Sequence, residues 1–136
     1  MAKLTGYVQI PMALDEGLAI QAETTPRYLM FRRELLNTGG PKFTSAQLLA
    51  MDKMPAGLPQ THTYGEFYNL VAWLLTRDKP AKVVALARAA GLDRPHAMDA
   101  LVKLYGFDSA AAAEQAYRTF LEDQRLLRPD PAPKGK

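Results

Sequence analysis

The feature that most constrains the fold is an apolar stripe between residues 63 and 77. Its members recur at i, i+3, i+4, i+7 and i+8, a spacing that places them on one face of an α-helix. They are Phe67, Leu70, Val71, Leu74 and Leu75. An apolar face of this width needs cover, so the remainder of the chain must supply elements that pack against a helix over about Thr63–Arg77.

The neighbouring segments are also helical in pattern and are separated by strong stop signals. Before the apolar stripe we expect three helices: one over Pro11–Glu23, one from Thr25-Pro26 to Gly39-Gly40, and one that starts after Thr44 or Ser45 and ends at Pro55. After the stripe we expect three more: one over 79–91 that Gly91 ends, one over 94–106 that Gly106 ends, and one that starts at Asp108 or Ser109. Residues 55–62 are expected to form a loop, and only residues 5–10 could alternate as a strand. The pattern predicts an all-α fold, an orthogonal bundle of about six to seven helices.

Size and composition indicate one domain. A chain of 136 residues can bury a usable core, and we assign residues 1–127 to a single helical domain. Residues 128–136 hold three prolines and no core-forming group, and we expect a disordered tail there. No window approaches the roughly 18–20 apolar residues of a membrane span, so no membrane partner is expected. The absence of cysteine excludes disulfides and thiolate sites but leaves the cellular compartment open.

The basic balance of the chain does not predict a nucleic-acid partner. Arg128, Lys134 and Lys136 against Asp130 account for most of the formal charge of +3, which leaves residues 1–127 close to neutral. The densest basic cluster, Arg32-Arg33, is followed at once by an acid. Nucleic-acid binders concentrate Lys and Arg on one face, often with aromatic stacking partners. We therefore expect no nucleic-acid binding.

Histidine and serine offer little catalytic signal. His62 lies in the expected loop and His96 near a helix start, and the two do not have the i, i+4 spacing of a helical metal site. We expect both to be surface histidines, and no zinc site can be assembled from motifs in this chain. Ser45 and Ser109 stand at helix starts, where capping of backbone N–H groups accounts for each hydroxyl.

Glu16 is the residue whose role the sequence leaves open. Taken alone, an acid in the helix over Pro11–Glu23 is expected to face solvent. However, the series "PMALDEGLAIQAE" resembles the second active-site helix of gluzincin zinc peptidases. In that family a Glu followed by Gly or another small residue is the third zinc ligand, so the resemblance implies that Glu16 is a metal ligand. A glycine at position 17 would also let a neighbouring helix approach closely.

Two further segments are similar to the same family. "TYGEFYNLVAWLL" looks like the helix in which a Tyr donates its phenol to the tetrahedral oxyanion, which implies a catalytic role for Tyr64. The segment from Ala87 to Leu121 is similar to the closing region of bacterial peptidase MA-like proteins. Together the resemblance covers about residues 9–124 and implies a peptide or protein substrate.

The chain departs from the family in one essential respect. The 15 residues before Glu16 contain no histidine, so the HExxH helix with two zinc ligands and the general base is missing. We therefore expect zinc only in the context of a complete enzyme and no catalysis by this chain alone. It is either the C-terminal part of a longer peptidase or a degenerate relative. The rival interpretation is a non-catalytic helical interaction module. Apolar surface left uncovered by the missing helix would favour a homo-oligomer.

Overall fold

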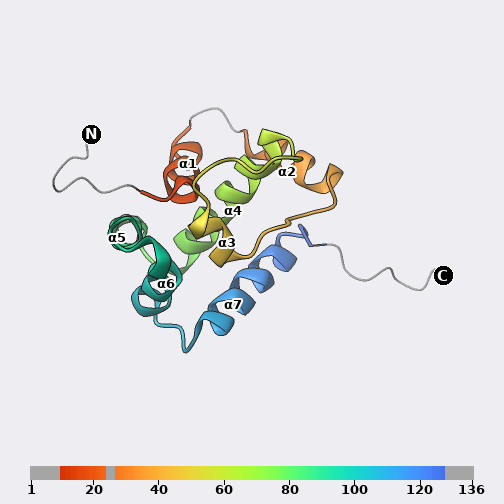
Figure 1. Ribbon diagram of the computed structural model, residues 1–136. Helices are drawn as coiled ribbons and strands as arrows, with labels where there is room; N and C mark the ends of the chain where they lie inside the picture. The colour runs from red at the N-terminus through yellow and green to blue at the C-terminus, as the bar shows by residue number, and fades with distance from the viewer. Residues whose placement is uncertain (1–9, 24–26, 128–136) are drawn as a thin grey trace, which may run out of the picture.

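The computed structural model describes residues 10–23 and 27–127, and within these ranges the fold is all-α, as the sequence predicts. The described part contains seven α-helices, one short 3-10 helix and no strand (Figure 1). The helices are α1 (Met12–Gln21), α2 (Tyr28–Asn37), α3 (Ser45–Ala50), α4 (Gln60–Arg77), α5 (Pro80–Leu92), α6 (Ala97–Tyr105) and α7 (Ala110–Asp123), with the 3-10 helix η1 at Arg94–His96. The expectations for residues 5–9, for Thr25-Pro26 and for the 128–136 tail lie outside the described residues.

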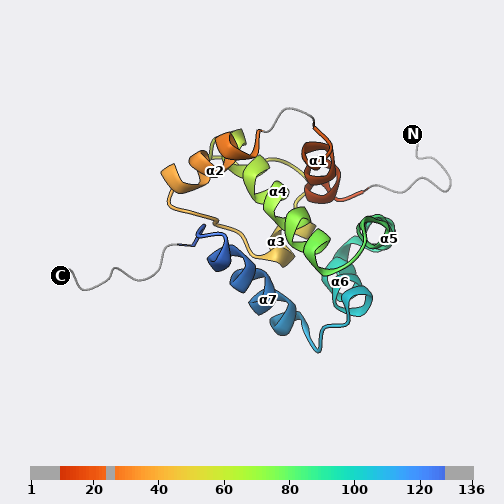
Figure 2. The ribbon, with the colours of Figure 1, turned by 180° about the vertical axis from the view of Figure 1, so that it is seen from behind.

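Helix α4 is the central element of the bundle. It packs against α1, α2, α3, α5 and α7, and the two opposite views show it running through the middle of the molecule (Figures 1 and 2). The predicted stripe is buried: Phe67, Leu70, Val71 and Leu74 have no exposed surface, and Leu75 packs partly buried beside them. The other faces of α4 are buried as well, because neighbours surround the helix on several sides.

An aromatic cluster joins α4 to the C-terminal half of the bundle. The ring of Trp73 stacks on Phe107 at 5.8 Å between centroids and lies 5.2 Å from the ring of Tyr117. Both Trp73 and Tyr117 are fully buried. Aromatic side chains bury the largest areas in a core, so this cluster fixes α7 against α4.

A glycine allows α1 and α4 to approach closely, as the sequence suggested. A Cβ added at Gly17 would collide with the Val71 side chain and would lie 2.6 Å from the Phe67 carbonyl oxygen. Only hydrogen fits in this space. The glycine in the middle of α1 therefore serves helix packing, whatever the role of the preceding Glu16.

Several expected boundaries agree with the structure and others do not. Helix α3 ends at Ala50 and does not continue toward Pro55, because the backbone is extended at Met51. Residues 94–96 form the 3-10 helix η1, and α6 begins only at Ala97. Gly39 and Gly106 adopt positive φ and follow the ends of α2 and α6. Helix α4 begins at Gln60, so the expected 55–62 loop is shorter: the Pro59 carbonyl accepts the backbone N–H groups of His62 and Thr63 and starts the helix early. Gly91 does not end α5, because the backbone leaves the helical region only at Asp93.

Candidate functional site

Glu16 and Tyr64, the two residues implied by the peptidase resemblance, line one small pocket. It has a volume of about 180 Å³ and lies where α1, the start of α2 and the first turns of α4 meet. Its walls are Glu16, Ala19, Ile20, Glu23, Arg27, Phe31 and Tyr64. Glu16 is half-buried and does not project fully into solvent. The fold thus brings together two residues that are 48 positions apart in the sequence.

The surroundings of the pocket are aromatic on one side and ionic on the other. The Tyr64 ring lies 6.3 Å from the Phe31 ring and 6.2 Å from the Phe67 ring, so packing from two helices orients it. Arg27 donates to Glu23 at 2.9 Å, and its guanidinium lies 4.9 Å above the centre of the Phe31 ring. The pocket therefore contains one carboxylate already paired with a cation, and a second, Glu16, in no ion pair with a described residue.

The described residues do not by themselves assemble a metal centre. Within residues 10–23 and 27–127 no three His, Asp or Glu side chains gather closely enough to hold an ion. A zinc site at Glu16 would need further ligands from another segment.

His62 is not the surface residue that the sequence predicts. Its exposed fraction is 0%, because the early start of α4 turns this residue inward toward α2 instead of leaving it in a loop. Its Nδ1 lies 2.5 Å from the hydroxyl of Thr38, the residue that ends α2. Its Nε2 lies 2.5 Å from the carboxyl of Glu66, one turn further along α4.

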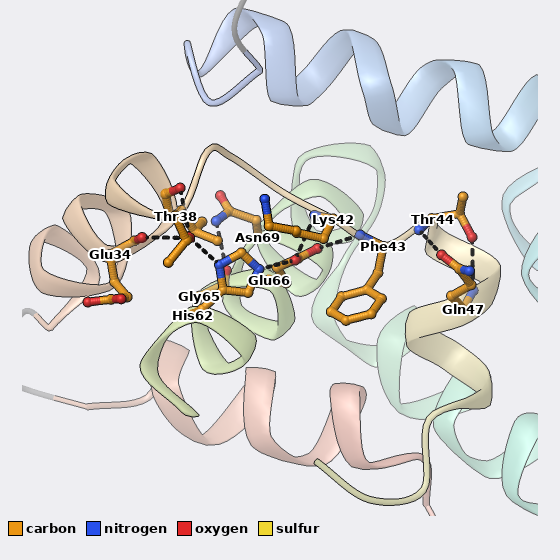
Figure 3. A network of polar contacts seen from close by, with 11 residues as sticks. Glu34, Thr38, Lys42, Phe43, Thr44, Gln47, His62, Gly65, Glu66 and Asn69 are labelled. Carbon is orange, nitrogen blue, oxygen red and sulfur yellow. Dashed lines mark hydrogen bonds and ion pairs between the residues drawn. The ribbon is translucent and has the colours of Figure 1, made fainter. Parts of the chain in front are cut away.

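Glu66, which the sequence analysis did not single out, is the centre of this buried network (Figure 3). Its Oε2 accepts the backbone N–H of Lys42 at 2.8 Å, and its Oε1 accepts that of Phe43 at 3.2 Å. One carboxyl group thus holds the 39–44 segment against α4. The i, i+4 spacing of His62 and Glu66 is the signal that could have revealed the pair, because it puts both on one helix face.

Burial favours the neutral forms of both partners. It raises the pKa of the Glu66 carboxyl from 4.5 to about 7, against the opposing effect of the two backbone N–H groups and of the Lys42 charge. Burial also lowers the pKa of His62, and the positive charge of Lys42 adds to that effect. A consistent set of donors follows: Glu66 donates to His62 Nε2, and His62 Nδ1 donates to Thr38. The Thr38 hydroxyl then donates to the Glu34 carbonyl at 2.8 Å.

The series Thr38, His62 and Glu66 also matches the order nucleophile, base and acid of a catalytic triad. The position of the hydroxyl argues against that role. Thr38 is the C-cap residue of α2, and its hydroxyl oxygen also lies 3.2 Å from the carbonyl oxygen of Leu35. The hydroxyl is hydrogen-bonded to backbone carbonyls at the end of α2. The network therefore holds α2, the 39–44 segment and α4 together.

Ser45, Ser109 and His96, the other polar residues considered from the sequence, lie outside this network. Ser109 caps α7 as expected, but Ser45 is not a cap: Thr44 closes the capping box of α3. The Ser45 hydroxyl instead donates to Glu114 at 2.5 Å, which joins α3 to α7. His96 is a surface histidine, with 64% of its side chain exposed, and the adjacent Asp93 carboxylate raises its pKa.

Comparison with known proteins identifies no relative. No family model, no curated protein and no solved structure matches the chain. In the described part of the chain, no helix has both the length and the apolar character needed to cross a bilayer.

Proposed function

We propose that this chain is the C-terminal helical portion of a gluzincin-like zinc metallopeptidase that cleaves a peptide or protein substrate. In this proposal Glu16 is the third zinc ligand, Tyr64 donates to the oxyanion, and the helices from Thr63 onward form a wall of the cleft. The supporting observation is that Glu16 and Tyr64 line the same pocket. If Glu16 were an ordinary surface acid, nothing would require it to meet Tyr64 there.

The chemistry of each residue suits its proposed role. A carboxylate in no ion pair with a described residue can serve as a metal ligand, whereas Glu23 is neutralised by Arg27. A phenol oriented by aromatic packing can donate a hydrogen bond to a developing negative charge. Zinc, when bound, would act as a Lewis acid and lower the pKa of a bound water. The histidine ligands and the general base would come from a segment that contains HExxH.

The first test is the gene and the protein it encodes. We expect the genomic DNA upstream of the Met1 codon to encode an in-frame HExxH motif. The complete protein should then bind zinc and cleave peptides, and Glu16→Gln should reduce its zinc content. Tyr64→Phe should retain zinc but lower kcat by about 10²- to 10³-fold, the usual cost of removing one oxyanion donor.

Glu122→Gln, an exposed change on α7, is the matched control and should alter neither zinc content nor kcat. An upstream stop codon would contradict the proposal that the chain belongs to a larger enzyme. So would a complete protein in which Glu16→Gln retains full zinc occupancy and activity.

The chain alone provides a second test. Calorimetric titration with zinc should reveal no tight site, because one unpaired carboxylate supplies too few ligands. A nanomolar affinity would show that other residues of this chain complete a metal centre, and would overturn the proposed division of the site.

A second candidate function is a non-catalytic helical interaction module. The observation in its favour is an exposed apolar surface at the start of α2, where Tyr28, Leu29 and Met30 are 44%, 57% and 45% exposed. Clustered apolar side chains of this kind often mark association sites. On this alternative the chain should self-associate in sedimentation experiments and Leu29→Glu should return it to a monomer, whereas zinc-related variants should have no effect.

A further inference from the structure

A second pocket lies away from Glu16, between α2, α4 and the end of α7. Its volume is about 510 Å³, within the range of small-molecule sites. Three aromatic residues line it: Tyr28, Tyr68 and Phe120. The rings of Tyr28 and Tyr68 stack nearly parallel, with 6.2 Å between their centroids and an interplanar angle of 12°.

Two arginines also line this pocket, Arg32 from α2 and Arg125 just after the end of α7. Arg32 donates to the backbone carbonyl of Gln124 at 2.6 Å, which fixes its position without neutralising its charge. Among the described residues neither arginine forms an ion pair. The pocket has one acidic lining residue, Asp123, so cations exceed anions there.

Arg125 occupies a backbone position that normally belongs to glycine. Its φ is +60°, the one positive φ of a non-glycine residue in the described part of the chain. Its N–H bonds to the Glu122 carbonyl, and the N–H of Leu126 bonds to the Leu121 carbonyl, the two hydrogen bonds of a Schellman helix end. Glycine would adopt this conformation at lower energy, so the helix end gains nothing from the arginine. Strain of this kind at a non-glycine residue is a pointer to function.

We propose that this pocket binds a planar aromatic molecule that carries a single anionic group. The aromatic side chains provide stacking surfaces for the ring, and the positive charges of Arg32 and Arg125 attract the anion. A neutral analogue would lose the charge contribution, and a cationic analogue would be repelled. This proposal is independent of the peptidase proposal, because it uses none of the residues around Glu16.

The experiment compares three naphthalene probes that differ only in charge: 1-naphthoate, 1-naphthalenemethanol and 1-naphthylmethylamine. Binding to the complete chain is measured by isothermal calorimetry, and the site is mapped by NMR chemical-shift changes. We expect 1-naphthoate to bind at least tenfold more tightly than the other two and to shift the resonances of Tyr68 and Phe120. Equal binding of all three, or shifts elsewhere in the molecule, would overturn the proposal.

Arg125→Gly separates binding from folding. We expect this variant to have a higher Tm than the wild type, because glycine relieves the backbone, and to bind 1-naphthoate at least tenfold more weakly. Arg118→Ala, an exposed change on α7 that does not line the pocket, is the control and should leave affinity unchanged. Unchanged affinity in Arg125→Gly would refute the assigned role of this arginine.

Discussion

At the scale of single residues, the most unusual group is the carboxyl of Glu66. It is fully buried and contacts the imidazole of His62, yet two backbone N–H groups also bond to it. The charge that faces it is that of Lys42 from the 39–44 segment. The buried hydroxyl of Tyr117 from α7 is uncharged, because burial raises its pKa well above 10. A buried acid of this kind makes stability depend on pH.

The direction of that dependence follows from proton binding. Between pH 4.5 and about 7 the folded protein holds more protons at Glu66 than the unfolded chain does. Stability falls as pH rises wherever the folded state binds more protons. The contribution of Glu66 is therefore fully present below pH 4.5 and is lost as the pH rises through about 7. His62 acts oppositely: its pKa is lowered in the folded state, so its contribution increases with pH up to about 6.5.

Glu66→Gln isolates the contribution of the carboxyl. We expect the difference in unfolding free energy, variant minus wild type, to increase as the pH rises from 4.5 to about 7. Its slope should not exceed about 1.4 kcal/mol per pH unit, the value for one proton. Urea unfolding at a series of pH values, followed by Trp73 fluorescence, measures it. A difference that does not increase over this range would contradict the raised pKa of Glu66.

Tyr117 gives a second prediction at a single atom. Its hydroxyl is buried and has no hydrogen-bond partner among the described residues. An unpaired buried polar group costs about 1–3 kcal/mol. Tyr117→Phe should therefore raise the unfolding free energy, measured by urea denaturation, by up to about 1–2 kcal/mol. A loss of stability would contradict this and would indicate that the hydroxyl has a partner, such as a buried water.

At the scale of helices, the sequence predicted the elements better than their polar contacts. The stripe from Phe67 to Leu75 was visible because one face of a helix is apolar. The burial of His62 and Glu66 could not be predicted in this way, because α4 is buried on more than one face and these two residues lie on a face that is polar. Hydrophobic periodicity detects apolar burial alone. The meeting of Glu16 with Tyr64 also depends on tertiary packing and could be suggested only by resemblance.

Alanine substitutions at two glycines in helix contacts, Gly17 and Gly65, should destabilise the protein to different extents. Gly17→Ala places a methyl group against the Phe67 carbonyl and the Val71 side chain, and we expect a loss of about 1–3 kcal/mol despite the better helix propensity of alanine. Gly65→Ala should cost less, since its nearest neighbours, at 3.1–3.2 Å, include the movable Leu35 side chain. Thermal unfolding of both variants provides the comparison. Equal losses would show that the close approach at Gly17 does not limit packing.

At the scale of the whole molecule, Trp73 joins the two halves of the bundle. Removal of a large buried aromatic ring costs about 3–5 kcal/mol, a large fraction of the 5–15 kcal/mol that stabilises a typical domain. We expect Trp73→Ala to lower the denaturation midpoint of all helices together, as measured by circular dichroism. Trp73→Phe, which retains an aromatic ring against Phe107 and Tyr117, should lose much less. Separate transitions in Trp73→Ala would show that the bundle is not one cooperative unit.

The central position of α4 also has a consequence for the synthesis of the protein. The main partner of α1 is α4, which the ribosome completes only after the whole segment from Gln21 to Arg77. At 5–20 residues per second this takes on the order of 3 to 11 s. During that interval the apolar side of α1 lacks its main partner in the nascent chain. This side of α1 is therefore available to a chaperone on the ribosome until α4 is made.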